Sequence, residues 1–221
     1  MARVSAEHLE ARKQSIFDAA QKVFSRRGQE SASMAEIAAE AGISPGLIYR
    51  YFPSKEALAL ACLRHGADSA ISEWHNIAAE FRDPADAFKQ MARKSFDEMS
   101  APDAADFSRL MLEDHLSASR SADPVLRAAL IEQREHIALA LADSLERMIE
   151  AGELDPSVDP HSLGQALLAF YYGTRTLHMV DPSLDFAKML AQLQTLLELA
   201  RPRGRQPDAA AAIGAPAGAR S

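Results

Sequence analysis

Apolar residues recur at helical spacing along nearly the whole chain, and this periodicity restricts the possible folds more than any other feature. In the first stripe, apolar side chains return every three or four residues and would share one helix face. Its members are Ile16, Ala19, Ala20, Val23 and Phe24. No segment of useful length alternates apolar and polar residues, as a half-buried β-strand would. The sequence therefore predicts an all-α fold.

Three further stripes in the second half of the chain predict long helices that pack as a bundle. Their members are Leu126, Leu130, Ile137, Leu141, Leu145 and Met148, then Leu163, Leu167, Phe170 and Leu177, and finally Phe186, Met189, Leu190, Leu193 and Leu197. Helix starts are expected at repeated Asp-Pro pairs, because Asp caps a helix and Pro fits its first turn. The pairs are Asp83-Pro84, Asp123-Pro124, Asp159-Pro160 and Asp181-Pro182.

The net charge of -7 is distributed unevenly along the 221 residues. Residues 1–60 carry +1, residues 61–200 carry -11, and residues 201–221 carry +3. The acidity therefore belongs to the middle of the chain and does not exclude nucleic-acid binding by the N-terminal part. The last segment is rich in Ala, Gly, Pro and Arg, and we expect it to form a disordered tail.

Several classes of protein are disfavoured by what the sequence lacks. The single cysteine, Cys62, allows no internal disulfide and suits a cytoplasmic protein. No run approaches the roughly 18 apolar residues of a membrane span. No two of the seven histidines stand at helical metal-ligand spacing. Because phosphate-loop and nucleophile-elbow motifs are also missing, we expect no catalytic residue, no metal, no cofactor and no enzyme activity.

The segment from Gly28 to Lys55 reads GQESASMAEIAAEAGISPGLIYRYFPSK and predicts short helices in quick succession. Gly28 can adopt the left-handed conformation that ends the first helix. Ser33 and Glu36 have the spacing of a capping box, in which each side chain satisfies a free backbone N–H at a helix start. A second helix is therefore expected after Ser33, running to about Ala41.

A tight turn and a third helix follow. Gly42 can supply the positive φ of the turn, and Ser44-Pro45 is suited to open a helix that runs to about Tyr51. Two helices joined in this way form a helix-turn-helix, whose second helix enters the major groove of DNA. The residues expected to face the DNA are Ser44, Pro45, Gly46, Tyr49, Arg50 and Tyr51. Ser54 is suited to cap the next helix, and Lys55, at the start of that helix, is expected to contact a phosphate.

The order of these residues resembles the TetR family of bacterial transcription regulators. The matching text is A-x-x-x-F ending at Phe24, then I-A-x-x-A-G-I-S, L-I-Y-x-Y-F and S-K-E, within about residues 12–62. The resemblance implies that Ser33 begins a phosphate-contacting helix, that Ser44 to Tyr51 is the recognition helix, and that Lys55 contacts the DNA backbone. Gln29 departs from the pattern, because the family usually has an aromatic residue there.

The resemblance also implies about nine helices, a homodimer formed largely through the last two helices, and an effector cavity in the C-terminal domain. The expected division is a flexible N-terminus (1–7), a helix-turn-helix domain (8–54), a ligand-sensing and dimerisation domain (55–200) and a tail (201–221). The residues expected at the dimer interface are Leu163, Leu167, Phe170, Leu177, Met189, Leu193 and Leu197.

Candidate effector residues combine aromatic or methionine surface with a few polar groups. They are Trp74, Met91, Met111, His115, Arg134, Tyr171 and Arg175. The two arginines suit an acidic effector, but the excess of acidic residues in this domain favours internal ion pairs instead.

The resulting hypothesis is a sequence-specific DNA-binding repressor that a small-molecule effector releases from a palindromic operator. One alternative is a DNA-binding dimer that ignores effectors. Another is a helical enzyme with an incidental capped helix pair. Loss of operator binding on addition of a ligand would separate the first two.

Overall fold

A computed structural model describes residues 6–101, 104–120 and 124–198. Within these ranges the chain forms nine α-helices and one short 3-10 helix, and no strand. The helices are α1 (Ala6–Arg27), α2 (Met34–Glu40), α3 (Pro45–Tyr51), α4 (Lys55–Glu80), α5 (Pro84–Asp97), η1 (Glu98–Ser100), α6 (Ala104–Arg120), α7 (Pro124–Glu150), α8 (Pro160–Val180) and α9 (Phe186–Glu198). The all-α expectation is confirmed. The expected tail, 201–221, lies outside the described residues, as do residues 1–5 of the expected N-terminal segment.

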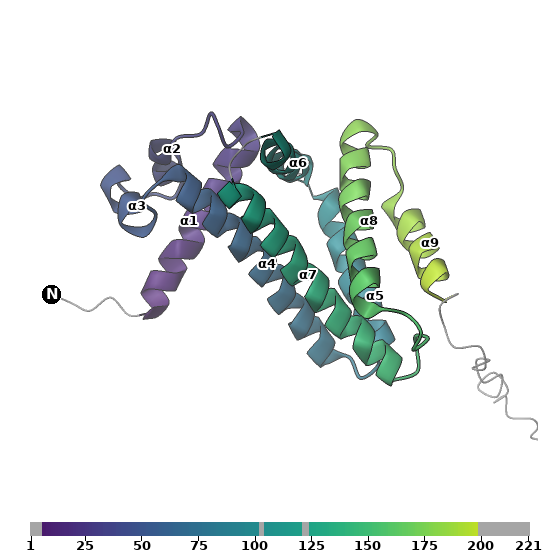
Figure 1. The fold of residues 1–221 in the computed structure, drawn as a ribbon. Helices are drawn as coiled ribbons and strands as arrows, with labels where there is room; N and C mark the ends of the chain where they lie inside the picture. Colours follow the sequence, from purple (N-terminus) through teal and green to yellow (C-terminus); the bar gives the residue numbers. More distant parts are fainter. Residues whose placement is uncertain (1–5, 102–103, 121–123, 199–221) are drawn as a thin grey trace, which may run out of the picture.

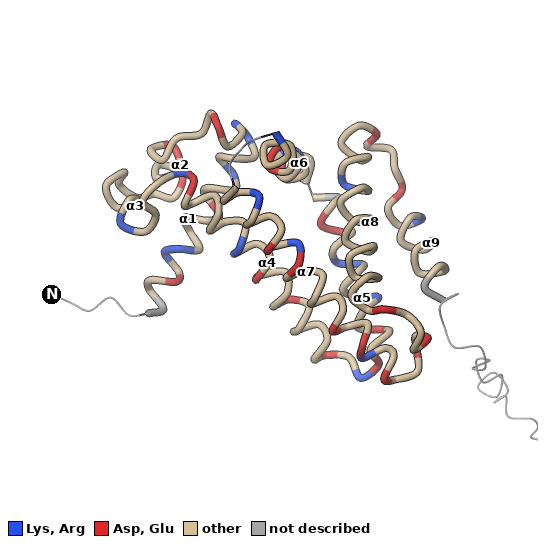
Figure 2. Tube along the Cα trace, viewed as in Figure 1, with Lys and Arg blue, Asp and Glu red and all other residues tan. Residues whose placement is uncertain are grey.

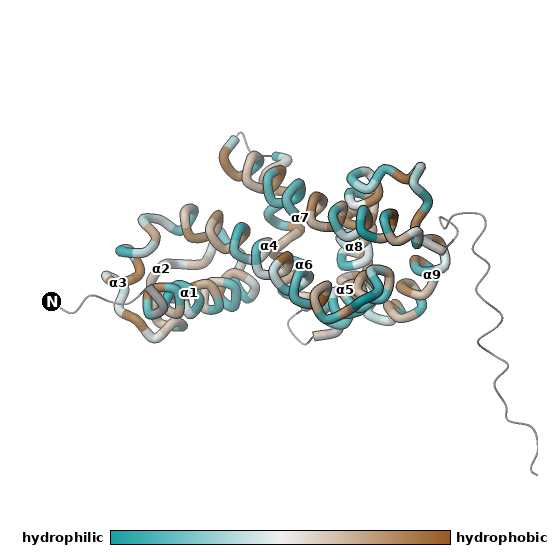
Figure 3. The backbone as a smooth tube through the Cα atoms, turned by 90° about the horizontal axis from the view of Figure 1, so that it is seen from below, coloured by the Kyte–Doolittle hydropathy of each residue, from teal (hydrophilic) through white to brown (hydrophobic). Residues whose placement is uncertain are grey.

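The first three helices and the start of α4 enclose one core. The first apolar stripe is buried there, together with residues of the three following helices. The largest of its fully buried side chains are Ile16, Ile37, Ile48 and Leu58. Because α2 and α3 have only seven residues each, this shared core, and not intrinsic helix propensity, holds them in place. Figures 1 and 3 show this unit at one end of the molecule.

The remaining helices form a bundle in which α7 packs against both α4 and α8. Buried side chains of α4, α5, α7 and α8 form a second core, which includes Phe88, Leu145 and Leu167. A third cluster joins α5 to α9 through Phe96 and Phe186. In both views, α8 and α9 lie at the end of the molecule opposite to α3 (Figures 1 and 3).

Helix α6 connects the two ends. It packs against α1 on one side and against α7 and α8 on the other. Leu110 of α6 contacts the N-terminal core, and the carboxylate of Glu113 lies near Gly28 at the end of α1. The N-terminal unit is therefore supported by α6 as well as by the long helix α4.

The expected helix starts are mostly confirmed, with one correction. Asp83 and Asp159 are N-caps whose side chains accept backbone N–H bonds, each followed by Pro in the first turn. Pro124 begins α7, while Asp123 lies outside the described residues. Asp181, however, ends α8, and α9 begins only at Phe186. The Asp181 carboxylate accepts bonds from the backbone and hydroxyl of Ser183, which stabilise a turn instead of a helix start.

Candidate nucleic-acid interface

The start of α2 is fixed by the expected capping box. The hydroxyl of Ser33 accepts the backbone N–H of Glu36 at 3.2 Å, and the Glu36 carboxylate accepts the backbone N–H of Ser33 at 2.9 Å. The Ser33 hydroxyl also donates to that carboxylate. These bonds and, to a smaller extent, Arg27 lower the pKa of Glu36 below its usual value. The exposed Ser33 is thus held rigidly at the helix start.

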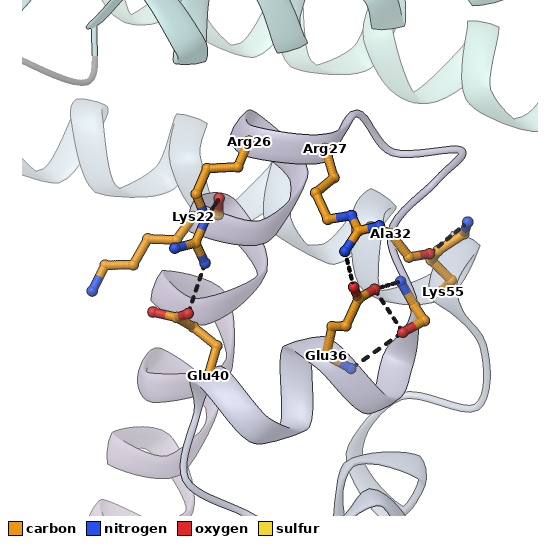
Figure 4. A network of polar contacts seen from close by, with 8 residues as sticks. Lys22, Arg26, Arg27, Ala32, Glu36, Glu40 and Lys55 are labelled. Carbon is orange, nitrogen blue, oxygen red and sulfur yellow. Dashed lines mark hydrogen bonds and ion pairs between the residues drawn. The ribbon is translucent and has the colours of Figure 1, made fainter.

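Two ion pairs fasten the end of α1 to α2, as Figure 4 shows. Arg27 pairs with Glu36, and Arg26 pairs with Glu40 at 2.7 Å. The bond from Arg26 is also the main reason why the pKa of Glu40 is lowered. Because both arginines are engaged with carboxylates, they contribute little free positive charge to a DNA-facing surface.

Lys55 lies at the first position of α4 but reaches back to the loop before α2 (Figure 4). Its ammonium donates to the carbonyl oxygens of Glu30, at 2.6 Å, and Ala32, at 3.0 Å. The cap of α4 is Ser54, whose hydroxyl accepts the backbone N–H of Ala57 as expected. The structure therefore brings Lys55 next to Ser33, with two of the three ammonium protons already used.

The turn between α2 and α3 follows the expected pattern. Gly42 has a φ of +65°, in the left-handed region that favours glycine. Half-buried Ile43 packs on the N-terminal core. Helix α3 spans Pro45–Tyr51, as the sequence predicts. Ser44 occupies the N-cap position, but its hydroxyl makes no capping hydrogen bond.

Helix α3 presents an outer face of polar and small residues. Ser44, Pro45, Gly46, Tyr49 and Arg50 are exposed, with the Tyr49 side chain 53 % exposed. Ile48, on the opposite side, is fully buried. Tyr51 is half-buried and packs against the N-terminal core, so its ring is less available than that of Tyr49.

The charge of this end of the molecule differs between the helices. Figure 2 shows basic residues along α1 and on α3. Within the described residues, Arg50 makes no ion pair, whereas Arg26 and Arg27 are paired. The free guanidinium on α3 therefore stands out as a cation that a phosphate or a base edge could take up.

The residues expected at the dimer interface are not all on the surface. Leu167 is buried in the second core, and Leu163 and Leu193 pack against it. Phe170 and Met189 are half-buried around the α5–α9 cluster. Leu177 is 57 % exposed. Leu197 is in α9, but its side chain is outside the described residues. Among the members of the expected set whose side chains the structure describes, Leu177 is the most available to a partner.

The candidate effector residues do not gather in one pocket. Met91 is buried in the second core, and Trp74 is half-buried beside it. His115 is exposed, with Nδ1 lying 2.7 Å from the carbonyl oxygen of half-buried Met111. Arg134 is exposed on α7. A groove of about 730 Å³ lies along α4 and α5, but its lining residues include none of these seven.

The structure does bring Tyr171 and Arg175 together. The guanidinium of Arg175, which is 3 % exposed, donates to the Tyr171 hydroxyl at 2.8 Å. It also bonds Ser108 and the Ala104 carbonyl oxygen, both on α6. Sequence reasoning missed Ser108, because a serine within a helix carries no signal that a residue 67 positions later will bond it.

Neither a metal site nor a membrane-spanning helix is found in the described part of the chain. No group of His, Cys, Asp or Glu side chains there could hold a metal ion. No helix there is both long and apolar enough to cross a membrane.

Comparison with known proteins identifies the N-terminal unit. The family model described as "Bacterial regulatory proteins, tetR family" matches residues 16–62, from the middle of α1 into α4. The chain is 28% identical over 158 residues to the HTH-type transcriptional regulator UidR of Escherichia coli, covering 72% of this chain and 76% of UidR. It is 26% identical over 160 residues to the HTH-type transcriptional repressor Rv1474c of Mycobacterium tuberculosis, with 72% and 77% coverage.

Solved structures agree in fold. The regulator FadR of Bacillus subtilis, in complex with stearoyl-CoA, matches with a TM-score of 0.69 at 22% identity, over 83% of this chain and 96% of that one. A TetR transcription regulator from Haloarcula marismortui matches with a TM-score of 0.70 at 19% identity, over 87% and 98%. The ordered motif, the helix-turn-helix geometry and the all-α fold of the described residues agree: residues 16–62 form a DNA-binding domain of the TetR family, in a chain that is similar to HTH-type transcriptional regulators over 72% of its length.

Proposed function

We propose that this regulator is a repressor that binds a palindromic operator as a homodimer and leaves it when a small-molecule effector binds. In such a dimer two α3 helices occupy successive major grooves, about 34 to 36 Å apart. The name of the M. tuberculosis relative, a transcriptional repressor, supports repression. Because a bacterial operator lies in the cytoplasm, the proposed site of action is the cytoplasm.

The observation that carries the proposal is the exposed face of α3. Ser44 has an unused hydroxyl, and Arg50 has an unpaired guanidinium. Gly46 adds no side chain at the tip of α3, and no other atom lies within 4 Å of the place where a Cβ would be. Exposed polar groups without internal partners on a recognition helix are suited to base edges and phosphates. We assign Tyr49 to a phosphate contact through its exposed hydroxyl.

The proposed DNA surface also includes Ser33 and Lys55. Ser33 stands at the start of α2, where the backbone N–H groups of a helix favour a phosphate. Lys55 keeps one ammonium proton free beside it. We assign Tyr51 and Pro45 to packing against the groove wall, because Tyr51 is half-buried and Pro45 has no donor.

The homodimer is proposed to form through an exposed apolar stripe on α8. Its members are Ala166, Ala169, Gly173, Leu177 and Val180, all exposed and spaced by three or four residues. Small residues in such a row permit close helix approach, and Val180 is 84 % exposed. Of the interface residues expected from the sequence, this proposal keeps Leu177 at the centre and gives Leu163 and Leu167 to the protomer core.

Effector release requires that the ligand prefer one of two spacings of the α3 helices. A preference of about 100-fold corresponds to roughly 2.7 kcal/mol of coupling. FadR, with a similar fold, was solved in complex with stearoyl-CoA. That complex supports a ligand-responsive C-terminal domain here, and the alternative remains a DNA-binding dimer without an effector.

Mobility shift with the protein's own promoter DNA, repeated across a salt series, tests the DNA-binding part. We expect one fragment to be retarded specifically, and Arg50→Ala to weaken that binding by about 1–3 kcal/mol. Arg82→Ala is the matched control, because Arg82 is also exposed but follows α4, away from α3. Equal effects of the two substitutions, or no retarded fragment at any salt, would contradict the assignment of α3.

A further inference from the structure

We propose that Arg175 is the anion-binding residue of the effector site, and that the effector is an organic anion with an apolar body, such as a carboxylate or a phosphate monoester. This inference rests on the proposed ligand response. It adds the residue that binds the effector and the chemical class of that effector.

The first observation is that Arg175 is a buried cation without a counter-anion. Its side chain is 3 % exposed. Nε donates to Ser108 Oγ at 3.1 Å, Nη1 to the Tyr171 hydroxyl at 2.8 Å, and Nη2 to the Ala104 carbonyl oxygen at 3.2 Å. Each of these acceptors is neutral. No carboxylate of the described residues lies within ion-pair distance of the guanidinium, so the internal ion pair expected from the sequence is not formed.

The acidic groups around Arg175 do not replace that partner. Burial raises the pKa of Tyr171, so its hydroxyl stays neutral at physiological pH. Glu98 feels the charge of Arg175, but its pKa is raised by burial and by Glu73. Arg134, the other arginine expected to bind an effector, has an exposed side chain 3.9 Å from the carboxylate of Glu135. Of the two arginines, Arg175 is therefore the buried one, and no carboxylate of the described residues pairs with it directly.

An uncompensated buried charge is unfavourable, and a ligand anion would relieve this cost. A guanidinium offers five N–H groups in a planar fork that fits carboxylate and phosphate oxygens. Three of those groups are used, so two remain for a ligand. The guanidinium is thus partly occupied, and by neutral acceptors.

Two aromatic rings lie against the guanidinium, that of half-buried Tyr171 at 5.5 Å and that of Phe107, which is the exposed one of the two. The Phe107 ring of α6 lies 4.9 Å from the guanidinium carbon, and this side chain is 38 % exposed. Displacing that ring would open Arg175 to solvent without unpacking a core helix. An entering anion would exchange a cation–π contact for a charge-assisted bond, which is the stronger interaction.

The surroundings suit an apolar ligand body and supply a second unused polar group. Phe96 contacts both the Tyr171 and the Phe186 rings, with centroids 6.2 and 6.3 Å apart. His178 lies one turn along α8 from Arg175, and its ring contacts that of Phe186 with centroids 4.4 Å apart and the planes tilted by 50°. Its buried Nδ1 has no hydrogen-bond partner. On one helix, therefore, buried Arg175 has hydrogen bonds but no paired anion, and the buried Nδ1 of His178 has no hydrogen-bond partner.

Binding at Arg175 would also act on α6. The guanidinium holds the first turn of α6 through Ala104 and Ser108. The same helix packs Leu110 on the core of the DNA-binding unit. A ligand oxygen that competes for the guanidinium would break its hydrogen bonds to Ala104 and Ser108 and so free the start of α6 to move. Because α6 packs against α1, this movement would shift α1.

Calorimetric titration of the full chain, without DNA, tests the site. The probes are octanoate and octyl phosphate, with octanol as the neutral control. We expect both anions to bind and octanol not to bind. Arg175→Met should weaken anion binding at least about tenfold, because a charge-assisted bond is lost, whereas Arg134→Met should leave it unchanged. Equal binding of octanol, no binding of either anion, or wild-type affinity in Arg175→Met would overturn the proposal.

Two further variants keep the test valid if Arg175→Met fails to fold by circular dichroism. Arg175→Lys retains the charge but loses the fork, and it should also weaken binding. Phe107→Ala removes the exposed ring that lies against the guanidinium and should strengthen octanoate binding. Weaker octanoate binding by Phe107→Ala would overturn the proposed entry past this ring. A mobility-shift assay with octanoate then separates the effector role from the DNA-binding function. If the anion binds but does not release the DNA, the effector role is contradicted. If the protein does not bind DNA at all, only the proposed function is contradicted.

Discussion

Lys55 makes internal hydrogen bonds that support the DNA-binding unit. Its ammonium bridges the carbonyl oxygens of Glu30 and Ala32, which lie 25 and 23 residues earlier in the chain. These carbonyls belong to the loop that leads to Ser33. A charged donor between two carbonyls fixes the loop, and the loop fixes the start of α2. We therefore infer that Lys55 positions Ser33 in addition to any phosphate contact.

Replacing Lys55 by Met should lower the free energy of unfolding by roughly 1–2 kcal/mol, because two bonds from a charged donor are lost. Urea unfolding followed by circular dichroism measures this change. Lys89→Met is the matched control, since Lys89 makes only an exposed pair with Asp86 and should cost less than about 0.5 kcal/mol. If Lys55→Met weakens operator binding but unfolds at the wild-type urea concentration, the positioning role is wrong.

For single residues, the sequence predicts the interactions that form between near neighbours in the chain. The capping box of Ser33 and Glu36, the left-handed Gly42 and the cap at Ser54 each depend on residues within four positions, and all three are confirmed. The bonds of Lys55 and Arg175 join residues far apart in sequence. They exist only after the helices have packed, so spacing along the chain carries no sign of them.

Among the elements, α6 carries a buried acid at the junction with the DNA-binding unit. Asp114 is 7 % exposed, and burial together with the nearby Glu113 raises its pKa from 3.8 to about 7. Its charge also acts on Cys62 of α4, whose pKa is raised to about 12 mainly by burial. The folded protein therefore prefers Asp114 protonated. The stabilising contribution is complete below about pH 4 and is lost as the pH rises through about 7.

Asp114→Asn should remove this dependence, because the amide stays neutral at every pH. Each unit of raised pKa corresponds to about 1.4 kcal/mol, so we expect the variant to be at least about 2 kcal/mol more stable than wild type at pH 8. The two proteins should converge near pH 4. Thermal unfolding across this range is the measurement, with Asp143→Asn on the exposed face of α7 as control. A stability difference independent of pH would show that Asp114 is ionised in the folded state.

The approach of α8 to α7 depends on one small residue. A Cβ at Gly164 would lie 2.8 Å from the carbonyl oxygen of Ala138 and 3.3 Å from the Cβ of Leu141. Gly164→Ala should therefore destabilise the chain by about 1–3 kcal/mol in urea unfolding, since the two helices must separate. Gly66→Ala, in α4 with nothing within 4 Å of the added carbon, should instead stabilise it by up to about 1 kcal/mol. Similar values for both would mean that α8 can shift freely on α7.

The helices themselves were more predictable than their outward faces. Stripes of apolar residues show which side of a helix is buried, but they do not say whether the partner is the same chain or a second copy. Leu167 and Leu177 belong to one stripe, yet the first lies in the core and the second is 57 % exposed. The same ambiguity explains why the expected effector residues are spread over separate clusters. Which stripe residues face a second copy, and which residues gather around an effector, both depend on how the helices are arranged in space.

In the whole molecule, the proposed DNA-binding surface and the proposed dimer interface are separated along the long axis. The reading helix α3 and the apolar stripe of α8 lie at opposite ends (Figures 1 and 3). The long helices α4 and α7 run side by side between them, and α6 braces the N-terminal unit. In the proposed dimer the α8 interface lies far from the proposed DNA-binding helix, so a small rotation at α8 would become a larger displacement of α3. The dimer geometry would then set the distance between the two α3 helices.

Leu177→Glu tests this arrangement. Burying two glutamates across a symmetric α8 interface is unfavourable, so light scattering should show a change from dimer to monomer. A monomer reads one half-site, and the loss of the linked second contact should weaken operator binding at least about 100-fold. Leu139→Glu is the control, because Leu139 is 50 % exposed on α7 but lies outside the stripe. If Leu177→Glu stays dimeric while Leu139→Glu becomes monomeric, the subunits meet through α7, and the spacing of the α3 helices is set by that helix.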